Sequence, residues 1–202
     1  QEARAKIIDY YEVQKDTRQV EDWRKALLAA YKSDRSDKSP RMKYLAAQVE
    51  FIFAEPVMES YKQIQLKLPL NKTLKNKRAA MQKALDVYEN INAYAVAEYT
   101  TAATHRIGEI YRTLAKDLMS SERPKGLDED AMDEYNVLLE EQAFPFEDKA
   151  IEFFTANLAY ARDGVYTEWV EKSVAALQTL QPARYGKTCL LYTSDAADEE
   201  DS

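Results

Sequence analysis

The scarcity of glycine is the feature that most constrains the fold of this chain. Only four of the 202 residues are glycine and six are proline, while alanine, leucine, glutamate, lysine and glutamine are abundant. The abundant residues have high helix propensity, and no long stretch alternates polar and apolar residues with the period of two that a strand needs. The sequence therefore predicts an all-α chain.

Apolar residues also recur with the spacing of helix faces, as Met81, Leu85 and Tyr88 do. Proline, glycine and other turn residues divide this pattern into eight predicted helices and a ninth with a less definite start. Their ranges are 2–15, 18–33, 40–54, 56–67, 72–97, 99–121, 128–143, 146–162 and 165–180. Pro56 stands inside an apolar run, so it either opens a new helix or kinks a continuous one.

Several segments match the tetratricopeptide repeat, a pair of helices with a period of about 34 residues. Residues 104–111 match its first helix, and residues 84–88 and 150–154 match its second helix. The small Gly108 is predicted to let the partner helix approach closely. The match at 150–154 lies too far from the match at 104–111 for the two to form one standard repeat. Residues 121–146 are therefore predicted to be an insertion with a helix of its own. The alternative is an alanine-rich helical bundle without a repeat.

Short motifs in residues 83–187 extend this likeness to a family. They include Ile-Gly-Glu-Ile-Tyr (107–111), Ser-Glu-Arg-Pro-Lys-Gly-Leu (121–127), Asp-Gly-Val-Tyr (163–166) and Pro-Ala-Arg-Tyr (182–185). This part of the chain resembles the C-terminal part of large bacterial tetratricopeptide-repeat proteins. The resemblance implies a periplasmic or cell-envelope protein that accompanies energy-transducing or motility systems, with a cytoplasmic location as the alternative. It implies no catalytic residues.

The expected organisation has three parts. Residues 1–71 form N-terminal helical repeats that are incomplete at the N-terminus, since the chain starts at Gln1 rather than Met and is expected to be an internal piece of a longer protein. Residues 72–187 form a helical repeat pair with the insertion, and residues 188–202 form a tail. Residues 189–199 resemble a translated sequencing-library adapter, so the tail is expected to be disordered and foreign to the fold.

Excluding the tail changes the charge of the chain. It holds five of the 35 acidic residues and none of the 28 basic ones, so the net charge moves from −7 to −2 (30 acidic against 28 basic). This mild charge argues against a nucleic-acid partner. The only cysteine, Cys189, also leaves with the tail. No stretch is long and apolar enough to predict a membrane span.

Charge is unevenly distributed along the rest of the chain. Residues 60–85 contain seven basic residues and no acidic one, whereas residues 128–152 contain ten acidic residues and one basic one. These segments are either two solvated helix faces, which could face each other, or patches that steer an oppositely charged partner. No aromatic residue stands between Lys62 and Lys83, which counts against single-stranded nucleic acid as the partner.

Catalytic chemistry finds little support in the sequence. His105 is the only histidine and has no cysteine companion, so a surface or groove position is favoured over a metal-ligand or general-base role. Glycine-rich phosphate loops and nucleophile elbows are absent from the sequence. A helical enzyme that uses a pair of carboxylates is a less favoured alternative. We expect no enzyme activity, no cofactor and no metal.

The sequence thus favours a non-catalytic scaffold or adaptor that binds a protein or peptide partner on a helical-repeat surface. The residues predicted to contact the partner are Tyr94, Tyr99, His105, Glu109 and Arg112. The alternative is a structural spacer within a longer envelope protein.

Overall fold

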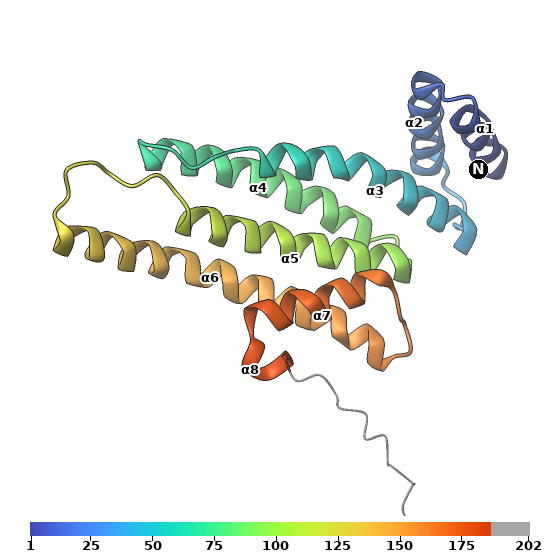
Figure 1. Cartoon of the computed structure of the whole chain (residues 1–202). Helices are drawn as coiled ribbons and strands as arrows, with labels where there is room; N and C mark the ends of the chain where they lie inside the picture. The colour runs from blue at the N-terminus through green and yellow to red at the C-terminus, as the bar shows by residue number, and fades with distance from the viewer. Residues whose placement is uncertain (187–202) are drawn as a thin grey trace, which may run out of the picture.

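The computed structural model describes residues 1–186 and shows an all-α protein (Figure 1). Its helices are α1 (Glu2–Val13), α2 (Thr17–Ser33), α3 (Pro40–Lys62), α4 (Leu70–Asn92), α5 (Ala97–Met119), α6 (Glu129–Arg162), α7 (Glu168–Leu180) and α8 (Pro182–Tyr185). Residues 1–186 contain no strand. Within the same residues, no helix has the length and apolar character needed to cross a membrane. The predicted tail at 188–202 lies outside the described residues.

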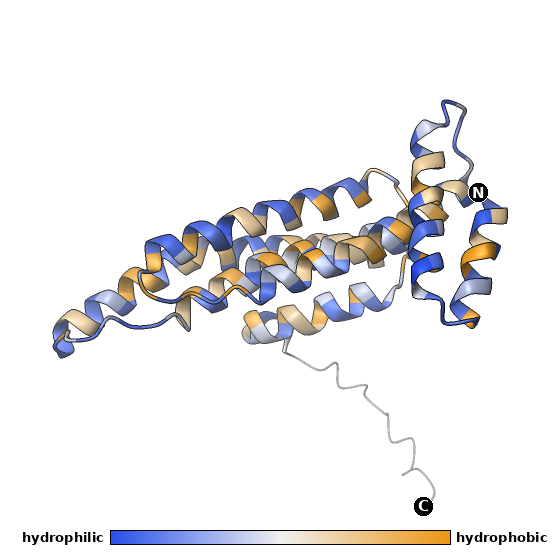
Figure 2. Ribbon diagram, turned by 90° about the horizontal axis from the view of Figure 1, so that it is seen from above, coloured by the Kyte–Doolittle hydropathy of each residue, from blue (hydrophilic) through white to orange (hydrophobic). Residues whose placement is uncertain are grey.

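A short hairpin of α1 and α2 sits across the beginning of α3, at one end of the long helices (Figures 1 and 2). Asp16 begins α2 by accepting a hydrogen bond from the backbone N–H of Gln19 at 3.1 Å, which satisfies a free donor of the first turn. The guanidinium of Arg24 donates to Glu12 at 2.6 Å and so joins the two helices of the hairpin.

The four long helices α3 to α6 follow one another as antiparallel neighbours (Figure 1). Tyr61 joins two of them across the core, because its buried hydroxyl donates to the carbonyl oxygen of Ile110 at 2.8 Å. One cluster of buried apolar residues extends from Ala5 to Ala143. Buried residues on both sides of the predicted boundary at residue 71 therefore share one core.

Helices α5 and α6 are in close contact at Gly108. A Cβ atom at this position would lie 2.6 Å from Cε1 of Phe154, which is closer than two carbon atoms can come without a shift. Phe154 is fully buried in this contact. The prediction that Gly108 permits a close helix approach is confirmed.

Two of the predicted helix boundaries are wrong. The predicted helices 40–54 and 56–67 are one helix, α3, which ends at Lys62. Of the two alternatives for Pro56, the structure therefore has the continuous helix and not the new one. The predicted helices 128–143 and 146–162 are likewise one helix, α6, which runs through Pro145. A proline inside a helix removes one backbone hydrogen bond. In α3, buried residues on both sides of the proline belong to one core. In α6, Ala143 packs on that core, whereas Ala150 and Phe154, after the proline, pack in a second cluster with α7.

The continuity of α6 also changes the predicted insertion at 121–146. This segment contains the α5–α6 loop and the first half of α6, and it has no separate helix of its own. The pair α3 and α4 spans residues 40–92, and the pair α5 and α6 spans residues 97–162. Both pairs are longer than the tetratricopeptide period of about 34 residues. What the structure shows is a series of antiparallel helix pairs.

Candidate functional site

Helix α6 is the longest of the described helices. A capping residue stabilises its start, and buried residues hold its inner face against the other helices. Asp128 caps it by accepting a hydrogen bond from the backbone N–H of Ala131 at 2.9 Å. Acidic residues in the first turn interact favourably with the helix dipole. The buried inner residues are Leu139, Ala143, Ala150, Phe154 and Asn157. This anchoring turns the opposite side of α6 to solvent.

Large apolar side chains stand on that solvent side. Val137 is 53% exposed, Leu138 58% and Phe144 64%. Val137 and Phe144 are seven residues apart, so they lie on nearly the same side of the helix, and Glu141 lies between them. We call Val137, Leu138, Glu141 and Phe144 the outer face of α6. Grouped exposed apolar side chains of this kind are typical of interaction surfaces.

The carboxylates around this face are not neutralised within the described chain. Residues 128–152 include ten acidic residues and one basic residue, Lys149. Lys149 pairs with Glu152 at 2.6 Å. The other nine carboxylates of this segment have no ion-pair partner among residues 1–186. The outer face of α6 is therefore apolar with an acidic border.

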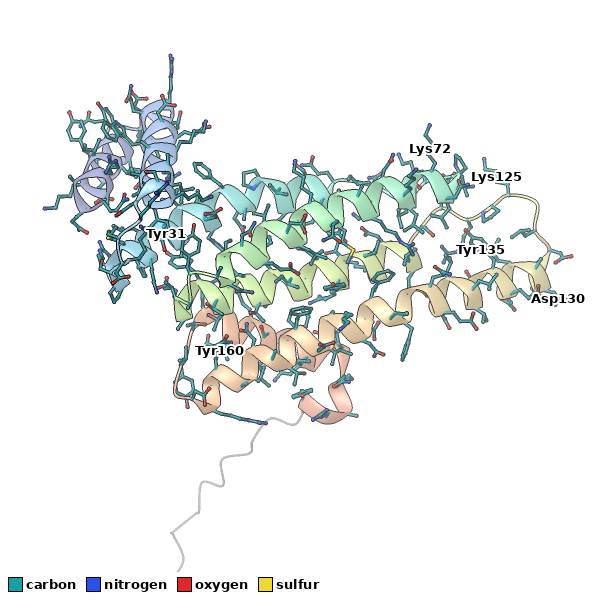
Figure 3. The ribbon with its side chains drawn as sticks, turned by 180° about the vertical axis from the view of Figure 1, so that it is seen from behind. Tyr31, Lys72, Lys125, Asp130, Tyr135 and Tyr160 are labelled. Atoms are coloured by element: carbon teal, nitrogen blue, oxygen red, sulfur yellow. The ribbon has the colours of Figure 1, made fainter. Side chains whose placement is uncertain are left out.

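The basic segment does not supply the missing countercharge. In the part of the chain that the structure describes, no ion pair joins its basic side chains to the acidic residues of α6. Arg78 does reach α6, but its guanidinium lies over the ring of Phe146, 5.8 Å from the centroid. Figure 3 shows Lys72 on the side of α4 away from α6. The two charged segments thus remain separately exposed.

Three of the predicted partner-contact residues are part of the core. Tyr94 and Tyr99 are each 8% exposed and His105 is 6% exposed. The hydroxyl of Tyr94 donates to a carboxylate oxygen of Glu50, and the ring of Tyr99 packs edge-on against Tyr44 with centroids 5.4 Å apart. Burial raises the pKa of both tyrosines. These side chains leave almost no surface for a partner.

The expected surface position of His105 is wrong, because α7 covers it. Its Nδ1 lies 3.0 Å from the hydroxyl of Ser173, and its ring packs beside Phe154 and Trp169. Burial, with a smaller contribution from the charge of Arg106, lowers the pKa of His105 to about 4. The imidazole is therefore neutral at neutral pH.

The contact between His105 and Ser173 belongs to a polar joint of three helices. The Ser173 hydroxyl donates to the carbonyl oxygen of Trp169 at 2.8 Å and accepts from Nδ2 of Asn157 at 2.9 Å. Asn157 on α6 also donates to the carbonyl oxygen of Thr101 on α5 at 2.9 Å. Because the serine proton is directed at a backbone carbonyl, this arrangement is suited to joining α5, α6 and α7 rather than to activating a nucleophile.

The other two predicted contacts, Glu109 and Arg112, lie on α5 and pair with each other. The distance between their charged groups is 3.2 Å, and their side chains are 23% and 36% exposed. This is a local pair between residues three apart on one helix. The structure does not bring it together with the outer face of α6.

Lys77 is a buried cation that sequence reasoning treated only as part of the basic segment. Its side chain is fully buried, and Nζ donates to the carbonyl oxygens of Tyr61 at 2.9 Å and Ile64 at 2.8 Å. The same nitrogen pairs with Asp117 at 2.6 Å. By these two hydrogen bonds and this ion pair, Lys77 joins α4 to the end of α3 and to α5.

Metal-binding geometry is not found in residues 1–186, where no three histidine, cysteine, aspartate or glutamate side chains are grouped to hold an ion. Comparison of the chain with protein-family models, with curated proteins and with solved structures found no match.

The outer face of α6 was missed from the sequence because a break was predicted at Pro145. That break divides the pattern between two helices and hides the seven-residue spacing of Val137 and Phe144. Acidic pairs follow the same spacing, at 133–134, 140–141 and 147–148. This repeated order of an apolar residue and an acidic pair is the signal that could have identified the face.

Proposed function

We propose that this protein is a non-catalytic adaptor that binds a partner protein through the outer face of α6. The observation that carries the proposal is the exposure of Val137, Leu138 and Phe144 on one continuous, anchored helix. Covering a side chain of this size removes apolar surface from water and contributes roughly 1.5–3 kcal/mol. Several such side chains side by side favour a docked partner over a solvated surface.

The rest of the chain supports this role by holding α6 in place. The polar joint of Asn157 and Ser173 and the close contact at Gly108 fix α6 against α5 and α7. A rigid element presents its side chains with little loss of conformational entropy on binding. The sequence motifs in residues 83–187 further support a tetratricopeptide-like adaptor in a bacterial envelope assembly, and that kinship is part of the proposal.

Affinity purification from the native cells tests the function. The wild-type chain is compared with a Val137→Ser/Phe144→Ser variant, which keeps the acidic residues and removes the exposed apolar groups. A Tyr166→Ser variant is the matched control, because Tyr166 is an aromatic residue that is 80% exposed but lies outside the outer face of α6.

We expect a specific partner to be recovered with the wild-type and Tyr166→Ser chains and lost with the double variant. Circular dichroism should show the same helicity for all three chains, since each substitution is at an exposed position. If the partners recovered with the double variant equal those of the wild type, α6 is not the docking site. If no partner is recovered with any chain, a spacer role replaces the proposal.

A further inference from the structure

Residues along the outer face of α6 are spaced seven positions apart, and this spacing indicates the shape of the partner that would fit it. Val137 and Phe144 are seven residues apart, and Asp130, which is exposed, extends the same line toward the start of the helix. Residues at this spacing drift by only about 20° per repeat around an α-helix. The line therefore runs along α6 for about 20 Å, at 1.5 Å per residue. A partner that follows it must itself be long and straight.

Acidic pairs border the line at the same interval. They are Asp133 and Glu134, Glu140 and Glu141, and Glu147 and Asp148. Val137 and Phe144 thus each lie between two acidic pairs. In helices that pack side by side, charged residues at the border of an apolar seam select the partner and its orientation.

The charges decide which partner fits. Like charges four residues apart, such as Asp130 and Glu134, destabilise a helix by a few tenths of a kcal/mol, and a basic partner would relieve this repulsion. A second copy of α6 would instead bring acidic residues against acidic residues. The basic face of α4 in a second copy offers Lys72, Lys75 and Lys83 but no large exposed apolar side chain to cover Val137 and Phe144.

Pro145 adds one more feature to this face. Proline has no N–H, so the backbone carbonyl of Glu141 lacks the donor that residue 145 would give in a regular helix. The carbonyl and the carboxylate of Glu141 are thus both acceptors within the outer face. A lysine or arginine side chain can donate to both.

We infer that the occupant of this face is a basic amphipathic helix of the partner protein, with apolar residues seven apart and lysine or arginine beside them. This inference rests on the proposed docking function of α6 and specifies its partner. The helical form follows from the seven-residue spacing and the basic character from the unneutralised carboxylates.

Fluorescence anisotropy with synthetic peptides tests the inference on the purified full chain. The probe is a labelled helix of about three heptads, with leucine at every seventh position and lysine beside it. A peptide of the same composition in scrambled order is the first control, and a peptide with glutamate in place of lysine is the second. The variants are Phe144→Ser and Glu141→Lys, with Tyr166→Ser and Glu89→Lys as matched exposed controls.

We expect the lysine peptide to bind the wild-type chain and both control variants, and to bind the two α6 variants at least about tenfold more weakly. Binding should also weaken by about tenfold between low and high salt, since screening acts on exposed charges. The glutamate peptide should not bind. Equal binding of the scrambled peptide, or unchanged binding to Phe144→Ser, would overturn the inference.

The two proposals fail in different ways. If the native partner depends on Val137 and Phe144 but the lysine peptide does not bind, the docking function stands and the basic-helix partner is wrong. If sedimentation shows a dimer that Phe144→Ser dissociates, the occupant is a second copy instead. If the native partner is indifferent to both apolar residues, the docking function itself is wrong.

Discussion

His105 shows how the surroundings of one residue decide its protonation. The ring lies in the joint of α5, α6 and α7, where it contacts Ser173, Phe154 and Trp169. Charging the ring there would place a cation in a site from which water is largely excluded, near the positive charge of Arg106. This burial could not be predicted from the sequence, because it depends on α7 covering the histidine.

The lowered pKa of His105 makes stability depend on pH. The folded value is about 4 against an ordinary value of 6.5, so between these values the unfolded chain binds more protons. Stability from the neutral ring is complete above pH 6.5 and is lost as the pH falls toward 4, by about 3 kcal/mol in all. We expect urea unfolding to show that, between pH 6.5 and pH 4, the free energy of unfolding of the wild type falls by this amount relative to that of His105→Gln. A difference between the two chains that does not change with pH would contradict the burial of a neutral ring.

At Gly108 it is close packing, and not charge, that determines which residue the fold accepts. An alanine here gains about 1 kcal/mol of helix propensity. Its Cβ would, however, lie 2.6 Å from the ring of Phe154, and overpacking of this kind costs about 1–3 kcal/mol. We expect Gly108→Ala to lower the free energy of unfolding, and Phe154→Leu to reduce that loss when the two are combined. Stabilisation by Gly108→Ala alone would show that α5 and α6 are farther apart.

At the scale of helices, the beginnings were easier to predict than the continuity. The beginnings of α2, α3 and α6 lie within one residue of the predicted positions, and in the structure Asp16, Ser39 and Asp128 cap them. The prolines at 56 and 145 also looked like local signals, but tertiary packing on both sides of each one outweighed the lost hydrogen bond. The all-helical character was predictable from composition. The continuity of α6 through Pro145 was not, because it depends on packing against other helices.

The candidate site, too, could be predicted only in part from the sequence. The acidic segment 128–152 was visible in the sequence, whereas its continuous outer face was not. Tyr94, Tyr99 and His105 had the chemistry of partner contacts, yet neighbouring helices cover them. Which side of a helix is covered is set by residues distant in the sequence, and periodicity alone does not give it.

The connection between α3, α4 and α5 depends on Lys77. Removal of its ammonium leaves the carbonyls of Tyr61 and Ile64 without their donor and the carboxylate of Asp117 without its cation. We expect Lys77→Met to lower the free energy of unfolding by about 3 kcal/mol, since the loss of one partner of a buried ion pair typically costs this much.

Lys75→Met is the matched control for this measurement, because Lys75 is an exposed lysine on the same helix. Urea unfolding of the control should stay within about 0.5 kcal/mol of the wild type. If both variants unfold like the wild type, Lys77 does not hold these helices together.

At the scale of the whole molecule, the chain keeps its two charged segments apart instead of pairing them. Apart from the buried Lys77, the basic side chains of α4 are exposed, as are the acidic residues of α6, and no ion pair within residues 1–186 joins the two sets. Separated charges of this kind raise the rate of encounter with an oppositely charged partner and select among partners. The apolar residues of the outer face of α6 then supply the contact area.

Site-specific photo-cross-linking in the native cells tests the docking role of α6 most directly. A photoreactive amino acid replaces Leu138 in one chain and Tyr166 in another, both of which are exposed in the isolated molecule. We predict a discrete cross-linked partner from position 138 and none from position 166. The absence of a cross-link at position 138, or the same products from both positions, would contradict the assignment of α6 as the docking face.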